Sequence, residues 1–545
     1  MIKTIQTTPF DDQKPGTSGL RKRTRVFMQP NYLENFVQSI LLELKETGGN
    51  SLVIGGDGRY YNHKAIQTII KMALANGIEH IHVAKNGLLS TPAASHFIRK
   101  YGISGGIILS ASHNPGGIDE DFGIKFNTAN GGPAPESVTN SIYYKTRNIT
   151  HYLIADIPDI DMDSMGTAQV LQGTIHVFDG IYDYVQLMEA LFDLARIKEL
   201  LENGFSLRLD AMNAATGPYL KAIFQDRLNM GEETLLRCIP LEDFGGIHPD
   251  PNLKYAASLV KSVVEGHSAS SPDFAAAFDG DGDRNMILGR EIFVTPSDSL
   301  AILAANATLA PGYRAGLKGI ARSMPTSQAA DKVAEQLGIP CFETPTGWKF
   351  FGNLLDADLV TLCGEESFGT GSNHVREKDG VWAALFWLNI LAVTRKSVKE
   401  LVQGHWRRFG RNYYSRHDYE AVDTSLAQAF MKRSEELLPS LNGNTVFGLA
   451  VKTTDNFSYV DPVDHSMTQR QGIRIVFEDG SRVVFRPSGT GTQGVTIRLY
   501  LERYETPHGN LSLHTQEAVQ ALVNWTEHVF DLRKSLHKTA PDVIT

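Results

Sequence analysis

The sequence predicts an α/β protein of several domains, in which three related mixed α/β units precede a C-terminal α+β domain of a different kind. Two observations predict this class. Through most of the chain, short apolar strands lead directly into glycine-rich or polar loops and then into amphipathic helices, which is the order of βα units. Toward the C-terminus, alternating strands are joined by a tight turn and followed by a helix. The 545 residues allow ~3 to 5 domains.

The βα order is clearest near the N-terminus. Pro92 suits the first turn of a helix, because the N–H that it lacks is not needed there. A third apolar strand, 106–109, runs into the polar loop 110–115. The predicted pairs are strand 52–54 with helix 63–75 across the glycine-rich loop 55–59, and strand 81–83 with helix 93–101.

The same order returns later in the chain. Residues 207–210 read as a strand before a polar loop, and residues 320–325 precede a helix at 327–337. That helix follows a proline-bearing loop, as the helix 93–101 does, so we expect related units. A further apolar strand is predicted at 359–362.

The C-terminal region changes character. Residues 473–477 and 482–485 alternate apolar and polar side chains, and the linking residues 478–481 predict a β-hairpin. A strand at 495–501 and a helix at 515–532 follow, which completes an α+β domain.

Composition excludes several classes of protein. The net charge of -9 and the pI near 6.0 argue against nonspecific nucleic-acid binding, which needs a basic face. Three cysteines without close spacing indicate neither disulfides nor a zinc site. The N-terminus lacks an apolar signal core, and the longest hydrophobic stretch, 383–393, is too short to span a bilayer. We therefore expect a cytoplasmic protein without a membrane or nucleic-acid partner.

The run 277–285 places Asp279, Asp281 and Asp283 at alternate positions between two apolar stretches. The glycines between them allow the three carboxylates to converge on one hard cation, for which Mg²⁺ is the best candidate. A calcium-binding EF-hand loop is excluded, because its sixth position would be Arg284 and its twelfth Arg290. Taken alone, the run is also compatible with a solvated acidic turn between two strands.

Ser112 follows the strand 106–109 at the end where open α/β sheets bind their ligands. A serine there is a candidate nucleophile, and His113 beside it could stabilise a transferred anion. The alternative for Ser112 is a turn residue that bonds its own backbone. His113 alone would more often be structural.

The loop 486–492, Arg-Pro-Ser-Gly-Thr-Gly-Thr, has the composition of an anion cradle, with one guanidinium, hydroxyl groups and free backbone N–H groups. Arg498 on the next strand offers a second guanidinium. The alternative is an ordinary hairpin loop with a surface arginine.

Four further segments carry weaker signals. Glu365 and Ser367, after the strand 359–362, pair a carboxylate with a hydroxyl, which suits sugar hydroxyls or a helix cap. Lys125 and Lys378 are surface lysines unless a site lies nearby. The basic, glycine-rich segment 14–23 and the loop 344–349 are the last candidates.

Together these loops resemble the α-D-phosphohexomutase superfamily, and within it the phosphoglucomutases, across essentially the whole chain. The matching segments are 16–21 (GTSGLR), 111–117 (ASHNPGG), 279–284 (DGDGDR), 364–369 (GEESFG) and 486–491 (RPSGTG). The Glu-Glu-Ser-Phe-Gly form of the sugar loop is similar to the glucose-preferring branch rather than to phosphomannomutases. Pro487 departs from relatives that often carry leucine there.

The resemblance implies an α/β fold with four domains around a central cleft, three related mixed α/β domains plus a C-terminal α+β domain. The expected domains are 1–187 with a phosphoserine loop, 188–296 with a metal-binding loop, 297–410 with a sugar-recognition loop and 411–545 with a phosphate-binding loop.

The resemblance also implies roles for single residues. Ser112 would be the phosphorylated serine, and an oxygen of its phosphate would complete an Mg²⁺ site with Asp279, Asp281 and Asp283. The catalytic electrostatics and proton handling would come from Arg21, His113, Lys125 and Lys378. The substrate would be bound by Thr17, Arg284, Thr346, Gly347, Glu365, Ser367, Arg486, Ser488, Gly489, Thr490 and Arg498.

The implied activity is the interconversion of glucose 1-phosphate and glucose 6-phosphate through a phosphoserine enzyme and glucose 1,6-bisphosphate, which also serves as activator. We expect a monomer whose partner is a small phosphosugar. The alternatives are a phosphohexomutase with substantial mannose-phosphate activity, a phosphosugar phosphatase or an inactive scaffold.

Overall fold

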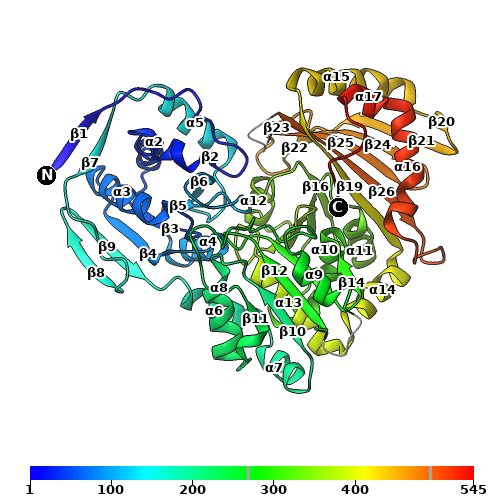
Figure 1. The fold of residues 1–545 in the computed structure, drawn as a ribbon, viewed down its shortest axis with the longest axis horizontal. Helices are drawn as coiled ribbons and strands as arrows, with labels where there is room; N and C mark the ends of the chain where they lie inside the picture. The colour runs from blue at the N-terminus through cyan, green and yellow to red at the C-terminus, as the bar shows by residue number, and fades with distance from the viewer. Residues whose placement is uncertain (267–270, 490–493) are drawn as a thin grey trace. The chain divides into compact units, whose positions relative to one another are not determined.

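The structure is a computed structural model, and it describes residues 1–266, 271–489 and 494–545 (Figure 1). The chain forms two compact units. Unit 1 comprises Met1–Pro296, Asn306–Lys318 and Gly347–Lys399, and unit 2 comprises Ser297–Ala305, Gly319–Thr346 and Glu400–Thr545.

The N-terminal part of unit 1 is built on a seven-stranded mixed sheet. Its four central strands run parallel, and the strands at both edges are antiparallel. In order across the sheet the strands are β2 (Leu20–Arg23), β6 (Asp121–Thr128), β5 (Gly105–Leu109), β3 (Ser51–Gly56), β4 (His80–Leu88), β9 (Gly173–Phe178) and β8 (Gly166–Val170).

The predicted βα pairs of this sheet are confirmed. Strand β3 leads to α3 (Asn62–Ala75), and β4 leads to α4 (Thr91–Tyr101). All residues of β3 and β5 are buried, as expected for central parallel strands covered on both faces. Ser90 caps α4, since its side chain accepts a hydrogen bond from Ala93 N, and Pro92 lies in the first turn.

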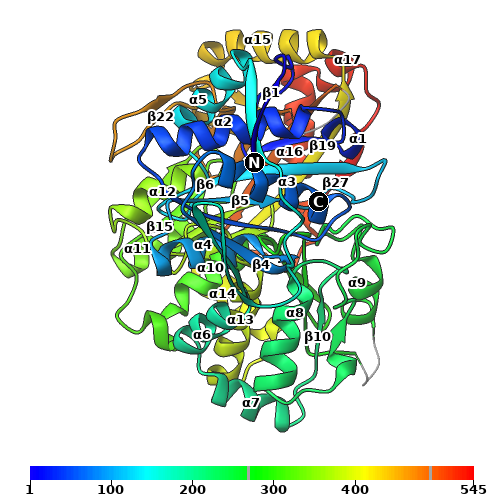
Figure 2. The same cartoon turned by 90° about the vertical axis from the view of Figure 1, so that its left-hand side faces the viewer.

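Segments far apart in the sequence also meet in this part. Strand β1 (Ile2–Gln6) pairs antiparallel with β7 (His151–Ala155), and the two lie side by side in Figure 1 and Figure 2. Helix α2 (Tyr32–Glu46) presents a largely buried face to the core that surrounds the sheet.

A five-stranded sheet follows in unit 1, in the order β11 (Leu235–Leu236), β10 (Leu207–Asp210), β12 (Phe274–Phe278), β13 (Asn285–Gly289) and β14 (Ile292–Val294). The acidic run is the connection between the antiparallel strands β12 and β13. Helix α13 (Gly380–Thr394) is buried almost throughout. Within the described ranges, no helix combines the length and the apolar character needed to cross a membrane.

One predicted strand is displaced. The apolar run 359–362 is not a strand; β17 spans Leu362–Glu365 and pairs with β18 (Gly369–Ser372). The reason is that Leu359 N donates to Leu354 O and so closes the end of helix α12 (Lys349–Asp356). Thr361, in turn, accepts hydrogen bonds from Lys318 N and Asn373 N. Glu365 therefore stands on a strand rather than in a loop.

Unit 2 contains an antiparallel seven-stranded sheet, and the hairpin predicted at residues 473–485 lies at its centre. Helices α15 (Thr424–Leu441) and α16 (Thr515–Phe530) pack on the sheet around a common apolar core (Figure 1). The strand order is β20 (Thr445–Val446), β21 (Leu449–Asn456), β24 (Ile473–Phe477), β25 (Arg482–Ser488), β26 (Val495–Glu505), β19 (Arg411–Val422) and β27 (Val543–Ile544).

Unit 2 also holds a βαβ element from the preceding part of the chain. Strand β15 (Ile320–Ser323) is joined by helix α11 (Ala329–Leu337) to the parallel strand β16 (Cys341–Thr344). The strand expected near 320–325 and the helix expected at 327–337 are confirmed, although the strand ends at Ser323 and the helix begins at Ala329.

Candidate active site

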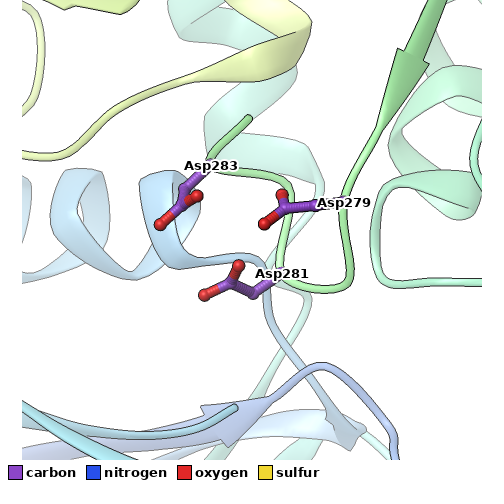
Figure 3. A group of neighbouring side chains, drawn as sticks. All are labelled: Asp279, Asp281 and Asp283. Atoms are coloured by element: carbon purple, nitrogen blue, oxygen red, sulfur yellow. The ribbon is translucent and has the colours of Figure 1, made fainter. Parts of the chain in front are cut away.

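The three aspartates of the acidic run form a compact carboxylate cluster at the turn between β12 and β13. Figure 3 shows the carboxylates of Asp279, Asp281 and Asp283 turned toward the same side of the loop. One oxygen of each lies within 4.8 Å of the others, and all three residues are buried. Burial excludes the alternative of a solvated acidic turn.

The cluster has the donor set of a site for a hard cation. Asp281 Oδ1 and Asp283 Oδ1 are buried and have no hydrogen-bond partner among the described residues. Burial, and then repulsion by Asp283 and Asp281, raises the pKa of Asp279 well above its usual value. A divalent cation with a preference for oxygen ligands would offset this repulsion and coordinate these two oxygens, so the residues fit Mg²⁺.

Ser112 lies directly against this cluster. Its Oγ donates to Asp279 Oδ2 at 2.6 Å, although the two residues are 167 positions apart in the sequence. The backbone of Ser112 adopts the left-handed conformation with φ of 53°, which is uncommon for a residue other than glycine and typical of functional sites. His113 Nδ1 lies 3.4 Å from Ser112 Oγ.

A buried pair, Asp57 and Arg59, holds the serine loop in this conformation. Asp57 accepts from Arg59 Nε at 2.9 Å and from Ser110 Oγ at 2.6 Å, and Ser110 Oγ in turn accepts from Ser112 N at 2.7 Å. Arg59 Nη2 donates to the Ser112 carbonyl at 2.9 Å. Sequence reasoning missed this pair. The loop 55–59 follows a strand of the same sheet as the loop 110–115, and this could have indicated that the two loops lie at the same end of the sheet.

Two lysines neutralise part of the carboxylate charge. Lys125 Nζ, on β6, contacts Asp281 and lies 3.4 Å from Asp283 Oδ2, and Lys378 Nζ lies 3.4 Å from that same oxygen. Burial opposes the charge on Lys125, but Asp281 and Asp283 outweigh it and raise its pKa. Thr91, another residue that sequence reasoning missed, donates from Oγ1 to Asp281 Oδ2 at 2.6 Å. Neither lysine is an ordinary surface residue.

The sugar-loop glutamate adjoins this group. Glu365 accepts from Gly347 N at 2.8 Å, and Lys378 Nζ lies 4.0 Å from its Oε2. A Cβ at Gly347, whose φ is +127°, would lie 2.7 Å from the side chain of Thr17, so the N-terminal loop reaches this position. Ser367 lies on the turn between β17 and β18 and is partly exposed.

Two arginines complete the group in unit 1. Arg284 N donates to Asp279 Oδ1 at 3.0 Å, and its guanidinium lies 3.9 Å from Asp250. Arg21 on β2 is opposite Gly123 on β6. Burial, and next the charge of Arg284, lowers the pKa of Arg21, while the acidic cluster acts in the opposite direction.

The remaining predicted site residues belong to unit 2. Arg486 on β25 and Arg498 on β26 are direct partners in the antiparallel register. Arg498 Nε also lies 3.9 Å from Asp418 Oδ2, and two guanidinium groups on opposite positions attract an anion between them. Ser488 and Gly489 follow on the same segment, and Thr346 follows β16. Thr490 lies outside the described residues.

Comparison with known proteins agrees with this geometry. Four family models match the chain in sequence: the phosphoglucomutase/phosphomannomutase alpha/beta/alpha domains I, II and III at residues 12–153, 182–291 and 296–409, and the phosphoglucomutase-1 C-terminal domain at residues 411–542. The predicted fold class, three α/β domains followed by a different C-terminal domain, is confirmed.

Relatives match over the full length. A phosphoglucomutase of Rhizobium radiobacter is 56% identical over 100% of both chains, and a cytoplasmic phosphoglucomutase of Pisum sativum is 51% identical over 100% of this chain and 99% of its own. The crystal structure of the open form of parafusin, an exocytosis-sensitive phosphoprotein and phosphoglucomutase of Paramecium, superposes with a TM-score of 0.93 at 49% identity, covering 100% of this chain and 99% of its own.

The fold and the serine–aspartate site thus define a member of the α-D-phosphohexomutase superfamily. Within it, the chain belongs to the phosphoglucomutase/phosphomannomutase family, on the side of the phosphoglucomutases, and the resemblance found in the five motifs is confirmed.

Proposed function

We propose that the chain is a phosphoglucomutase, an isomerase that interconverts glucose 1-phosphate and glucose 6-phosphate through a phosphorylated Ser112 and glucose 1,6-bisphosphate. The observation that carries the proposal is the contact of Ser112 Oγ with Asp279, which joins a nucleophile to a cation site across two separate loops. Full-length identity of about half with phosphoglucomutases supports the same activity.

Asp279, Asp281 and Asp283, together with an oxygen of phosphorylated Ser112, would hold Mg²⁺. When bound, the ion supplies neutralisation of the negative charge on the phosphoryl group. Asp281 Oδ1 and Asp283 Oδ1, which are buried and accept no hydrogen bond from the described part of the chain, support this assignment.

The residues of the chain direct the transfer itself. The bond between Ser112 Oγ and phosphorus breaks as the free hydroxyl of the sugar phosphate bonds to phosphorus, and the hydroxyl proton passes to a base of the site. Ser112 takes up a proton as its oxygen is released. Lys125, Lys378, Arg21 and His113 supply positive charge and proton handling around the transfer. After the bisphosphate reorients, the other phosphate returns to Ser112.

The substrate-binding roles remain proposals. We assign the phosphate that is not reacting to Arg486 and Arg498, since their cross-strand pairing suits an anion. The hydroxyl and backbone donors of the same segment are Ser488, Gly489 and Thr490. The sugar and the adjacent positions are assigned to Thr17, Arg284, Thr346, Gly347, Glu365 and Ser367.

Location, assembly and domain boundaries are also proposals. A cytoplasmic location is supported by the names of relatives such as the pea protein, although a relative from Marchantia polymorpha is named chloroplastic. We propose a monomer, and domain boundaries at 1–187, 188–296, 297–410 and 411–545.

The decisive experiment compares the chain with Ser112→Ala in a coupled assay of glucose 1-phosphate conversion, with Mg²⁺ and a trace of glucose 1,6-bisphosphate. Loss of the nucleophile should reduce turnover by about 10³-fold or more, with an unchanged unfolding midpoint. Ser164→Ala, at an exposed position, is the control and should retain full turnover. Phosphate release without isomerisation in the unmodified chain would instead support the phosphatase alternative.

A further inference from the structure

Three arginines surround Glu343 and join two parts of unit 2. Arg322 on β15 is the register partner of Glu343 on β16, and its Nη1 donates to Glu343 Oε1 at 2.9 Å. Arg482 Nη1, on β25, lies 3.2 Å from the same oxygen, and Arg474 on β24 donates to Oε2. One carboxylate is therefore shared between the βαβ element and the C-terminal sheet.

Arg482 makes the most contacts across this junction. It is 2% exposed, and its two terminal nitrogens donate to the carbonyls of Met324 and Thr326, each at 2.7 Å. Its register partner Glu502 lies 2.8 Å from Nη2 and accepts from Gln328 N at 2.7 Å. Both members of this ion pair thus contact the connection between β15 and α11.

The charges of the cluster are well matched. Burial alone would raise the pKa of Glu343, but Arg322, Arg482 and Arg474 outweigh burial and lower that pKa to about 2. Arg322 and Arg482 are buried and Glu343 is partly buried. Hydrogen-bonded ion pairs in such a setting hold side chains in fixed directions, because breaking one leaves an uncompensated charge.

The same strands lead to the proposed binding loops. Side chains alternate along a strand, so Arg482, Arg486 and Ser488 point to one face of β25. Across from them on β26, Glu502 pairs with Arg482 and Arg498 pairs with Arg486. On the other side of the junction, β16 ends at Thr344, two residues before Thr346.

We propose that Glu343 is a positioning residue that fixes the anion site of Arg486 and Arg498 relative to the loop of Thr346. The inference rests on the proposed function, in which these loops bind different parts of one phosphosugar. When the distance between the anion site and the loop of Thr346 is fixed, glucose 1,6-bisphosphate stays bound between the two phosphoryl transfers. When that distance varies, the bisphosphate is released more often.

The test uses Glu343→Gln, which keeps the shape of the side chain and removes its charge. We expect the KM for glucose 1-phosphate to rise at least fivefold, and the fraction of radiolabelled phosphoryl group that escapes as free bisphosphate in a single turnover to rise several-fold. The kcat should stay within threefold, and phosphorylation of Ser112 should be unchanged.

Asp455→Asn is the matched control. Asp455 accepts from Arg474 Nε at 2.8 Å, a bond between the neighbouring strands β21 and β24. Asp455→Asn therefore removes a charge beside the cluster but leaves Glu343 and its three arginine partners in place. This variant should have the KM and the escape fraction of the unmodified chain.

Each outcome decides one question. Glu343→Gln with an unchanged KM and escape fraction overturns the positioning role, whereas an unmodified chain that does not convert glucose 1-phosphate overturns the proposed function instead. If Glu343→Gln does not fold, Glu343→Asp, which keeps the charge and shortens its reach, is judged by the same two measurements.

Discussion

At the scale of single residues, Arg59 determines the conformation of the serine loop. Its side chain is fully buried, bonds both oxygens of Asp57 and donates to the carbonyls of Ser112 and Asp121 at 2.9 and 2.8 Å. A guanidinium can serve these acceptors at once because its donors form a planar fork. The strained backbone of Ser112 therefore depends on an arginine specifically.

We predict that Arg59→Lys lowers kcat by about 10- to 100-fold, because a single ammonium lacks the planar fork of donors that holds the serine carbonyl and Asp57 together, and small misplacements are costly. The free energy of unfolding should also fall by about 2 to 4 kcal/mol. Turnover measurements and urea unfolding would check both.

The control for this prediction is Arg25→Lys. Arg25 forms an exposed ion pair with Asp119, and such pairs contribute about 0 to 1 kcal/mol. If Arg59→Lys behaved like Arg25→Lys, the assignment of the serine loop to Arg59 would be wrong.

A second group of residues shows how burial decides chemistry. Ser372 Oγ lies 2.7 Å from His374 Nδ1, and His374 Nε2 lies 3.0 Å from Asp379 Oδ2, the pattern of an activated serine nucleophile. Ser372 and Asp379 are completely buried, so no substrate reaches the hydroxyl. Asp379 also caps α13 by accepting from Trp382 N at 3.0 Å, and the network fixes the residue next to Lys378.

At the scale of elements, the strands, the helices and the charged loops could be predicted from the sequence. The strands before Ser112 and Asp279 could be predicted because each is an apolar run that ends in small and polar residues. The displacement of β17 could not be predicted, because Leu359 N closes the end of α12 and Thr361 accepts hydrogen bonds from Lys318 N and Asn373 N. The contacts of Thr91 and Arg59 could not be read either, because they depend on how separate loops meet in three dimensions.

The acidic loop and the serine loop approach so closely that a glycine is required between them. A Cβ at Gly280 would lie 2.4 Å from the Ser112 carbonyl oxygen. Gly280→Ala should therefore push the two loops apart and weaken Mg²⁺ binding at least about tenfold, or about 1.4 kcal/mol. Calorimetric titration with Mg²⁺ measures this without reference to activity.

Gly352→Ala is the control for that substitution. Gly352 lies inside α12, where an added Cβ meets nothing within 4 Å. Alanine there should leave Mg²⁺ binding unchanged and stabilise the protein by about 0.5 to 1 kcal/mol. Equal Mg²⁺ affinities in the two variants would contradict the steric argument.

At the scale of the whole molecule, the two units have separate apolar cores. Unit 1 contains the cores around its two sheets, and unit 2 contains the core between α15, α16 and the C-terminal sheet. Chains with more than one core commonly unfold in more than one step. The proposed cation site belongs to unit 1 only, since all three aspartates lie there.

We therefore predict two calorimetric transitions that respond to different ligands. Mg²⁺ at about 100 times its Kd should raise the free energy of unfolding of unit 1 by about 2.7 kcal/mol and leave that of unit 2 unchanged. Protons should act on unit 2 through His405 on α14 (Val398–Phe409), because burial, and next the charge of Arg408, lowers the pKa of His405 from 6.5 to about 3.

The sign of the proton effect follows from that lowered pKa. His405 becomes protonated near pH 6.5 in the unfolded chain but only near pH 3 in the folded chain. The free energy of unfolding of unit 2 is therefore not reduced by His405 above pH 6.5. It falls as the pH drops from 6.5 toward 3, by as much as about 4 to 5 kcal/mol. Acidification from pH 7 to 5 should lower the transition temperature of unit 2 less in His405→Phe than in the unmodified chain. Equal shifts in both proteins, or a single transition moved by Mg²⁺ and protons alike, would contradict the assignment of separate units.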